Sequence, residues 1–284
     1  MSQNDLIKET AELDEVEDIE IDLLLEGLFR RYGYDFRSYA SASIRRRIWN
    51  FAHWQNVPTI SLLQDKLLHD PAVMEQFVLS LTVNVTAMFR DPLFYKAVRE
   101  KVVPLLKTYP FVRIWDAGCS SGEEAYSLAV VLAEEGLYDR CRIYATDMNE
   151  AVLRKAKAGI FPLSKMKEYT DNYIQAGGMA SFSEYYTAKF DHAILSNSLK
   201  RNIVFAQHNL VTDKSFNEFQ LILIRNVLIY FNDDLRHRVL DLLHGSLVKF
   251  GVLALGRKES LKFSSYDHAY EELDVREKLY RRIA

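Results

Sequence analysis

One short stretch of the sequence combines the residue types of a cofactor-binding turn. Residues 114–126 read IWDAGCSSGEEAY, so an apolar run ends in an aspartate and a loop of small residues follows. Glu123 and Glu124 then open a predicted helix. Gly118 and Gly122 allow the backbone to turn sharply and to approach a ligand closely. The pattern is typical of a nucleotide-type cofactor site, and an ordinary strand-to-helix turn rich in Gly and Ser is the alternative.

The two acids at the start of the helix restrict the chemistry of the ligand. A pyrophosphate binds at a helix N-terminus, where Glu123 and Glu124 would repel it. The loop also lacks the Lys-Ser/Thr pair of a phosphate-binding P-loop. S-adenosylmethionine fits better, because it has a ribose, an amino-acid tail and a sulfonium but no phosphate. Asp147 ends the next predicted strand, where an acid reaches ribose hydroxyls, and its alternative role is to cap the helix that follows.

Strands and helices alternate around this loop. The alternation predicts an α/β domain with a parallel sheet and helices on both faces. Period-two alternation at about 170–206 interrupts it and predicts a small antiparallel β insertion. We expect strands at 112–118, 141–147, 219–226 and 251–256, an edge strand at 277–284, and helices at 92–109, 123–136, 149–159 and 233–250.

The first part of the chain has a different pattern. Residues 1–20 are rich in acids and are predicted to form an acidic flexible tail. From 21 to 82, apolar residues at helical spacing predict a small all-α domain of four amphipathic helices. The second helix is expected to begin near Ser41 or Ser43, Thr59 should cap the third, and Pro71 should stand in the first turn of the fourth.

Composition limits the class of protein. The chain has 284 residues, 49% of them apolar and 26% charged, which is typical of a soluble globular protein. A net charge of −3 disfavours a nucleic-acid-binding protein. Its two cysteines have no metal-type spacing, so we expect no metal and a reducing compartment. No apolar stretch is long enough to span a membrane and no signal peptide is evident, so we expect a cytoplasmic location.

Five segments, in order, resemble those of the CheR-type chemotaxis-receptor glutamate methyltransferases. The resemblance implies a Rossmann-like class I S-adenosylmethionine-dependent methyltransferase domain at 92–284, with 83–91 as a linker that contributes to the cofactor site. Two positions depart from the family's pattern, with Ala125 where proline is usual and Lys258 where a small hydroxyl residue is usual. The segments are LTVNVTAMFRDPLFY, WDAGCSSGEEAYSLA, ATDMNEAVLRKAKAGIF, VFAQHNL and ILIRNVLIYF.

The resemblance also implies which residues form the site. Arg90 and Tyr230 would lie nearest the transferred methyl group, and they are the candidate catalytic residues. Taken alone, Arg90 could be a surface charge and Tyr230 a half-buried aromatic residue. The product would be S-adenosylhomocysteine. The implied cofactor-binding residues are Asn84, Thr86, Arg90, Gly118, Glu124, Asp147, Asn209, Leu210, Arg225 and Asn226.

The implied reaction is methyl transfer to glutamate side chains in the cytoplasmic helical domain of methyl-accepting chemoreceptors. Arg45, Arg46 and Arg47 would then dock an acidic receptor helix, with Trp49 packed inward. A solvated basic face is the alternative for the three arginines. Two other functions stay open, a small-molecule methyltransferase and a non-catalytic cofactor-binding regulator. We expect a monomer with neither a nucleic-acid partner nor membrane insertion.

Overall fold

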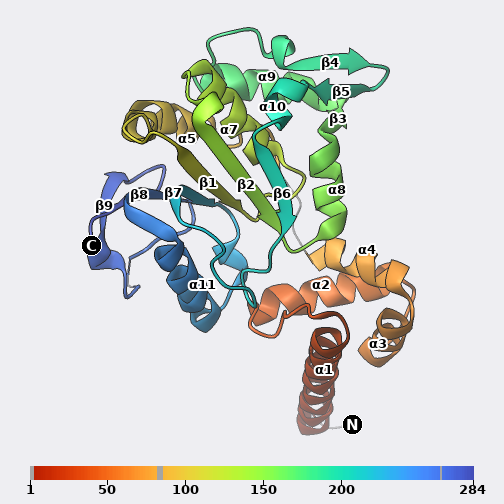
Figure 1. The fold of residues 1–284 in the computed structure, drawn as a ribbon. Helices are drawn as coiled ribbons and strands as arrows, with labels where there is room; N and C mark the ends of the chain where they lie inside the picture. Colours follow the sequence, from red (N-terminus) through yellow and green to blue (C-terminus); the bar gives the residue numbers. More distant parts are fainter. Residues whose placement is uncertain (1–2, 82–85, 263) are drawn as a thin grey trace. The chain divides into compact units, whose positions relative to one another are not determined.

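The computed structural model describes residues 3–81, 86–262 and 264–284, and for residues 3–14 it describes the backbone alone. The chain divides into two compact units. The first consists of Met1–Val83 and Tyr230–Leu235, and the second of Asn84–Ile229 and Arg236–Ala284. The first unit is built mainly from helices, and the second contains both sheets (Figure 1).

Four helices form most of the described part of the first unit, and the starts of two of them follow local sequence signals. The Thr59 hydroxyl accepts a hydrogen bond from Leu62 N at 3.2 Å, and Pro71 opens the fourth helix, both as predicted. The second helix begins at Ser41, although the residue at its N-cap is Ala40. The helices are α1 (Gln3–Tyr32), α2 (Ser41–Trp54), α3 (Ile60–His69) and α4 (Pro71–Leu81).

The first helix starts much earlier than predicted. We expected a flexible acidic tail over residues 1–20, but α1 already begins at Gln3. The segment contains neither Gly nor Pro and is rich in Glu, which favours helices. Acids near a helix N-terminus are also stabilised by the helix dipole. The prediction of a flexible chain from the acidic composition of 1–20 is therefore wrong.

A seven-stranded sheet organises the second unit, in the order β6-β2-β1-β7-β8-β10-β9. β10 is antiparallel to both of its neighbours, and the other pairs are parallel. The predicted edge strand is therefore corrected: β10 is internal, and the acid-rich β9, which the sequence analysis missed, forms the edge. The strands are β1 (Val112–Ala117), β2 (Cys141–Asp147), β6 (Ile203–Gln207), β7 (Phe219–Ile224), β8 (Leu247–Leu255), β9 (Tyr270–Asp274) and β10 (Leu279–Arg282).

The predicted antiparallel insertion is present, but its bounds were wrong. Its three strands are β3 (Ile160–Pro162), β4 (Tyr186–Lys189) and β5 (His192–Leu195), in the order β3-β5-β4. Its first residues, 170–175, belong to helix α9 (Met166–Gln175), which buries Met166, Tyr169 and Tyr173 at helical spacing. Residues 203–207 belong instead to the main sheet, because β6 pairs in parallel with β2.

The helices around the main sheet match most of the predicted ranges. α7 (Glu123–Glu134) follows β1, and α8 (Glu150–Ala158) follows β2 and lies beside β6 (Figure 1). α11 (Asp233–Ser246) ends before β8, so the predicted helix 233–250 was four residues too long. Smaller helical segments complete the chain, namely α10 (Asn197–Lys200) and short 3-10 turns.

The long helix predicted at 92–109 contains an irregular turn. α5 (Pro92–Ala97) passes through a π-helical segment, Val98–Val102, into α6 (Val103–Leu106). Pro104 explains the irregularity, because a proline within a helix removes a hydrogen bond and crowds the carbonyl of the preceding turn.

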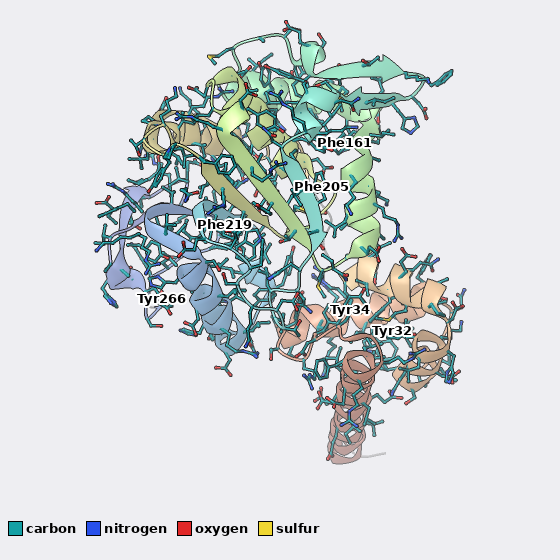
Figure 2. The ribbon with its side chains drawn as sticks, viewed as in Figure 1. Tyr32, Tyr34, Phe161, Phe205, Phe219 and Tyr266 are labelled. Carbon is teal, nitrogen blue, oxygen red and sulfur yellow. The ribbon has the colours of Figure 1, made fainter. Side chains whose placement is uncertain are left out.

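Aromatic side chains fill the space between the main sheet and the insertion. The ring of Tyr126, on α7, lies 6.0 Å from that of Phe161 and 5.8 Å from that of Phe205. Figure 2 labels Phe161 on β3 and Phe205 on β6. The hydroxyl of Tyr126 donates to the carbonyl of Ala156 at 2.8 Å, so this buried polar atom is satisfied.

Candidate cofactor-binding and active site

The carboxyl ends of β1, β2, β6 and β7 lie at one edge of the sheet because these strands are parallel. In open α/β sheets, ligands bind at this edge. Half of the ten residues predicted to bind the cofactor stand at or shortly after the ends of β1, β2 and β7. Asp116 pairs in register with Ala145 and Leu223, which places the ends of the three central strands level with one another.

The turn after β1 is locked in a conformation that requires its glycines. Gly118 has φ +87°, and a Cβ there would lie 2.6 Å from Cγ2 of Val227. Its backbone N–H and that of Cys119 both donate to the carbonyl of Thr146, at 2.8 and 2.9 Å. Any larger residue than glycine would therefore push the turn away from the β7 turn.

Asp147 links the ends of β1 and β2. Its carboxylate accepts hydrogen bonds from Ser120 N at 3.0 Å and from Asn149 N at 2.9 Å. Burial raises the pKa of Asp147, and these backbone donors oppose the rise. Asn149, rather than Asp147, caps α8 by accepting from Ala151 N. The alternative role of Asp147 as the helix cap is therefore excluded, and its carboxylate is held at the sheet edge.

A buried ion network joins the β7 turn to α7. Nη1 of Arg225 lies 2.5 Å from Oε2 of Glu124, and Nη2 lies 2.7 Å from Oδ2 of Asp91. Nη2 also lies 3.5 Å from the carbonyl of Arg90, and the guanidinium carbon is 3.9 Å from the ring centroid of Phe94. The structure thus brings three predicted residues together, and adds Asp91.

Asp116 is the most buried acid at this edge. It is 1% exposed, and its Oδ2 has no hydrogen-bond partner among the described residues. Burial raises the pKa of Asp116 well above its usual value; the charge of Glu124 adds to the rise, and that of Arg225 opposes it. A raised pKa favours the protonated form of the carboxyl group, which can donate a hydrogen bond as well as accept one.

Glu259 fixes the turn after β7. Its carboxylate accepts from the backbone N–H groups of Asn226, Val227 and Gly256, at 3.0, 2.9 and 2.6 Å. Asn226 has a positive φ of 61°, which these contacts hold in place. Lys258, the position that departs from the family's pattern, is exposed.

The other predicted cofactor residues have simpler surroundings. Asn209 and Leu210 are half-buried after β6, and the Asn209 side chain accepts from Val211 N at 3.0 Å. His208 N donates to the carbonyl of Asp147 at 3.1 Å, which brings this segment to the end of β2. Thr86 and Arg90 are half-buried. Asn84 lies outside the described residues.

Comparisons with known proteins agree with this geometry. The family described as "CheR methyltransferase, SAM binding domain" matches residues 84–278, and "CheR methyltransferase, all-alpha domain" matches residues 19–82. The chain belongs to the CheR methyltransferase family. The prediction of a CheR-type, S-adenosylmethionine-dependent methyltransferase with a class I fold is thereby confirmed.

Relatives match over most of the chain. Cher3 of Pseudomonas putida is 50% identical over 265 residues, which are 93% of this chain and 97% of that protein. The chemotaxis protein methyltransferase of Listeria monocytogenes is 31% identical over 237 residues, 82% of this chain and 86% of that protein. Chemotaxis protein methyltransferase 1 of Pseudomonas aeruginosa is 31% identical over 202 residues, 66% of this chain and 70% of that protein.

The sheet edge fits the cofactor of the CheR family. Gly118 leaves its side of the turn without a side chain, and Asp147 presents a fixed carboxylate suited to ribose hydroxyls. The unpartnered Oδ2 of Asp116 adds a buried polar group at the same edge. Within the described residues, no group of three or more His, Cys, Asp or Glu side chains is placed to hold a metal ion.

Tyr230, the other candidate catalytic residue, belongs to the first unit. It is half-buried, and its carbonyl accepts from Ala40 N at 2.9 Å. The guanidinium carbon of Arg47 lies 5.3 Å from the centroid of its ring. Its prediction came from the family resemblance alone, since an aromatic residue in an apolar segment carries no signal of its own.

The three arginines of α2 have three different environments. Arg45 pairs with Glu17 and Asp18 of α1. Arg47 donates to the carbonyls of Ser80 and Leu81, at 3.3 and 2.9 Å. Arg46 is exposed. Trp49, predicted to pack inward, is half-buried, and its Nε1 donates to Glu17 at 2.7 Å.

A groove of about 640 Å³ lies between α2 and α4. It is lined by apolar and basic side chains together with polar ones, and its Trp54 is 62% exposed. The residues that line it are Arg46, Arg47, Asn50, Phe51, Trp54, Gln76, Leu79 and Ser80.

No helix in the described part of the chain combines the length and the apolar character that crossing a membrane requires.

Proposed function

We propose that this methyltransferase transfers a methyl group from S-adenosylmethionine to glutamate side chains of chemoreceptors. The observation that carries the proposal is the turn after β1, which is locked onto Asp147 at the sheet edge. It occurs in a chain whose relatives include proteins named chemotaxis protein methyltransferases. The acceptor would be a glutamate on a helix of the receptor's cytoplasmic domain, and the product a glutamate methyl ester.

The proposed cofactor shell comes from the sheet edge. Asp147 would hold the ribose, and Asn209 and Leu210 would lie along the adenine-bearing side of the site. Glu124, Arg225 and Asn226 would surround the amino-acid tail. Asn84, Thr86, Arg90 and Gly118 complete the set. When bound, S-adenosylmethionine supplies an electrophilic methyl carbon on a sulfonium.

The acceptor side of the reaction needs little chemistry from the protein. A glutamate side chain has a pKa near 4, so it is ionised at neutral pH, and no residue has to remove a proton from it. The role of the chain is to hold the carboxylate in line for attack. Arg90 can orient the carboxylate through a two-point grip, and Tyr230 can align it through its hydroxyl.

The groove between α2 and α4 is the proposed dock for the receptor helix. Arg46 offers a positive charge to acidic side chains, and Phe51, Trp54 and Leu79 offer apolar contacts. Such a surface suits an amphipathic acidic helix, whose apolar residues recur at three- and four-residue spacing. Charge complementarity of this kind raises the association rate and weakens with salt.

Transfer of radiolabelled methyl groups from S-adenosylmethionine to membranes that carry chemoreceptors tests the proposal. The wild-type protein should place base-labile label on the receptor band, as expected of a carboxyl methyl ester. Arg90→Ala should lose the label, and because Arg90 also belongs to the proposed cofactor shell, calorimetry should show weaker binding of S-adenosylmethionine. Arg201→Ala, at an exposed arginine whose side chain is 57% accessible, is the matched control and should retain it.

Two other outcomes would contradict the proposal. No receptor label from the wild type, with normal cofactor binding, would favour a non-catalytic cofactor-binding regulator. Label on a small molecule rather than on the receptor would identify a small-molecule methyltransferase. We also propose that the protein is a monomer and is located in the cytoplasm. Sedimentation of the purified chain tests its oligomeric state.

A further inference from the structure

The segment that contains Tyr230 is held by the chain that precedes α2. Ala40 N donates to the carbonyl of Tyr230 at 2.9 Å, and Asn232 N donates to the carbonyl of Ser38 at 3.1 Å. Between these bonds, Tyr39 and Phe231 form an isolated antiparallel bridge. The Tyr230 backbone is therefore fixed within the helical unit, although its own sequence neighbour Ile229 belongs to the other unit.

The side chain of Tyr230 is held by a different residue of the same unit. The guanidinium carbon of Arg47 lies 5.3 Å from the Tyr230 ring centroid, within the range of a cation–π interaction. In this arrangement the flat guanidinium restricts where the ring can lie. The backbone bonds at Ala40 set the position of the residue, and Arg47 limits the direction of its phenol.

Arg47 is itself anchored on two sides. Its Nη1 donates to the carbonyls of Leu81 and Ser80, at 2.9 and 3.3 Å, and its Nε lies 3.4 Å from the hydroxyl oxygen of Ser43. The two carbonyls are at the C-terminal end of α4, where the helix dipole favours a positive charge. A guanidinium with these contacts is held in one orientation.

We propose that Arg47 is a positioning residue for Tyr230 rather than a residue that docks the receptor. One guanidinium joins the end of α4 to the Tyr230 ring, and so it fixes the phenol that acts on the acceptor. The expected effect of Arg47 on kcat rests on the proposed function, whereas its expected effect on the position of the Tyr230 ring does not. The neighbouring Arg46 is exposed on the groove and keeps the docking role.

Lysine cannot replace Arg47 in this role. An ammonium is a compact point charge and lacks the planar fork that reaches two carbonyls while it faces a ring. A misplacement of about 1 Å at a reacting group can reduce a rate by about 100-fold. Arg47→Lys should therefore keep the charge of α2 but lower kcat, and Arg47→Met should lower it at least as much.

Steady-state methyl transfer to a purified receptor fragment separates positioning from docking. For Arg47→Lys and Arg47→Met, kcat should fall by about 10- to 100-fold with the KM for the receptor unchanged. For Arg46→Met, the matched variant one residue away, the KM should rise and kcat should stay near that of the wild type. A raised KM with unchanged kcat in the Arg47 variants would overturn the proposal.

A second measurement does not depend on methyl transfer. With 3-fluorotyrosine placed at position 230, the ¹⁹F resonance should shift and broaden on Arg47→Met and on Arg47→Lys, and stay in place on Arg46→Met. An unchanged resonance in both Arg47 variants would refute the contact between Arg47 and Tyr230. If the wild type transfers no methyl group, the proposed function fails, and this resonance still decides whether Arg47 positions the Tyr230 ring.

Thermal unfolding of each variant tests whether the fold is kept. If Arg47→Met does not fold, Arg47→Lys alone is used for both measurements.

Discussion

Nη1 of Arg225 lies 2.5 Å from Oε2 of Glu124, and this pair ties the turn after β7 to the first turn of α7. The Arg225 side chain is 1% exposed, and its other terminal nitrogen lies 2.7 Å from Asp91. Charges this deeply buried are tolerated because they are paired, and the cost of removing one partner is large.

Arg225→Met should therefore weaken both the fold and the cofactor site. It leaves the carboxylates of Glu124 and Asp91 without their shared cation, which should cost about 3–5 kcal/mol in the free energy of unfolding. Urea denaturation measures this cost, and calorimetry should show weaker binding of S-adenosylhomocysteine. Lys165→Met removes the exposed pair with Glu168 and should cost less than about 1 kcal/mol. Equal costs for the two variants would contradict the prediction.

Gly118→Ala should disrupt the turn after β1 through a steric clash as well as through backbone strain. The added Cβ would lie 2.6 Å from Cγ2 of Val227, and φ is +87°. Gly136→Ala is the matched control, because Gly136 has φ +69° and no heavy atom within 4 Å of the added Cβ.

The control isolates the strain, which is about 1–2 kcal/mol for a left-handed residue other than glycine. Gly118→Ala should exceed this cost in urea denaturation and should also lose affinity for S-adenosylhomocysteine, which Gly136→Ala should keep. The additional change Val227→Ala should restore part of both losses. If Gly118→Ala behaves like Gly136→Ala, the close contact with Val227 is not what requires glycine.

The site residues that can be predicted from the sequence without the family resemblance are those whose neighbours along the chain mark the end of a strand or the start of a helix. Gly118, Glu124 and Asp147 stand at the ends of predicted strands or at a predicted helix start, where fold rules assign a role. Asp91 has no such signal, since its partner Arg225 is 134 residues away. Only the folded chain brings the two side chains together, and for the same reason Asp116 was seen merely as the end of a strand.

The fold shows the same division between local and distant information. Caps such as Thr59 and Asn149 are encoded within three residues, and the Thr59 cap is among the confirmed predictions. The insertion was misplaced because α9 uses Tyr169 and Tyr173, aromatic residues that also favour strands. The sequence predicts an edge strand at β10 because it does not show that β9 pairs outside it.

Asp116→Asn should change how stability depends on pH. Burial, with a smaller contribution from the charge of Glu124, raises the pKa of Asp116 well above its usual value. The folded protein therefore binds more protons at this group than the unfolded chain, so its contribution to stability falls as the pH rises above about 4. Asparagine resembles the protonated acid and has no such dependence.

The stability of Asp116→Asn relative to the wild type should therefore increase with pH, by at most about 1.4 kcal/mol per pH unit. Urea denaturation of both proteins at several pH values above about 4, where the aspartate of the unfolded chain is ionised, measures the difference. A difference that is independent of pH, or that falls as the pH rises, would show that Asp116 is ionised in the folded protein.

Arg45 and Arg46 should contribute unequally to the proposed receptor dock. Glu17 Oε1 lies 3.4 Å from Nη1 of Arg45, and Asp18 also pairs with this guanidinium, so α1 already supplies its counter-charges. Arg46 is exposed and lines the groove. An acidic receptor helix would have to displace Glu17 and Asp18 from Arg45, whereas Arg46 has no such acids to lose among the described residues.

Arg46→Gln should therefore raise the KM for a receptor fragment more than Arg45→Gln does. It should also reduce the dependence of KM on salt more strongly. The double change Glu17→Gln with Asp18→Asn should make Arg45 available and lower the KM of the otherwise unchanged protein. Steady-state assays at low and high salt test both expectations, and equal effects of the two arginine variants would mean that the α1 acids do not shield Arg45.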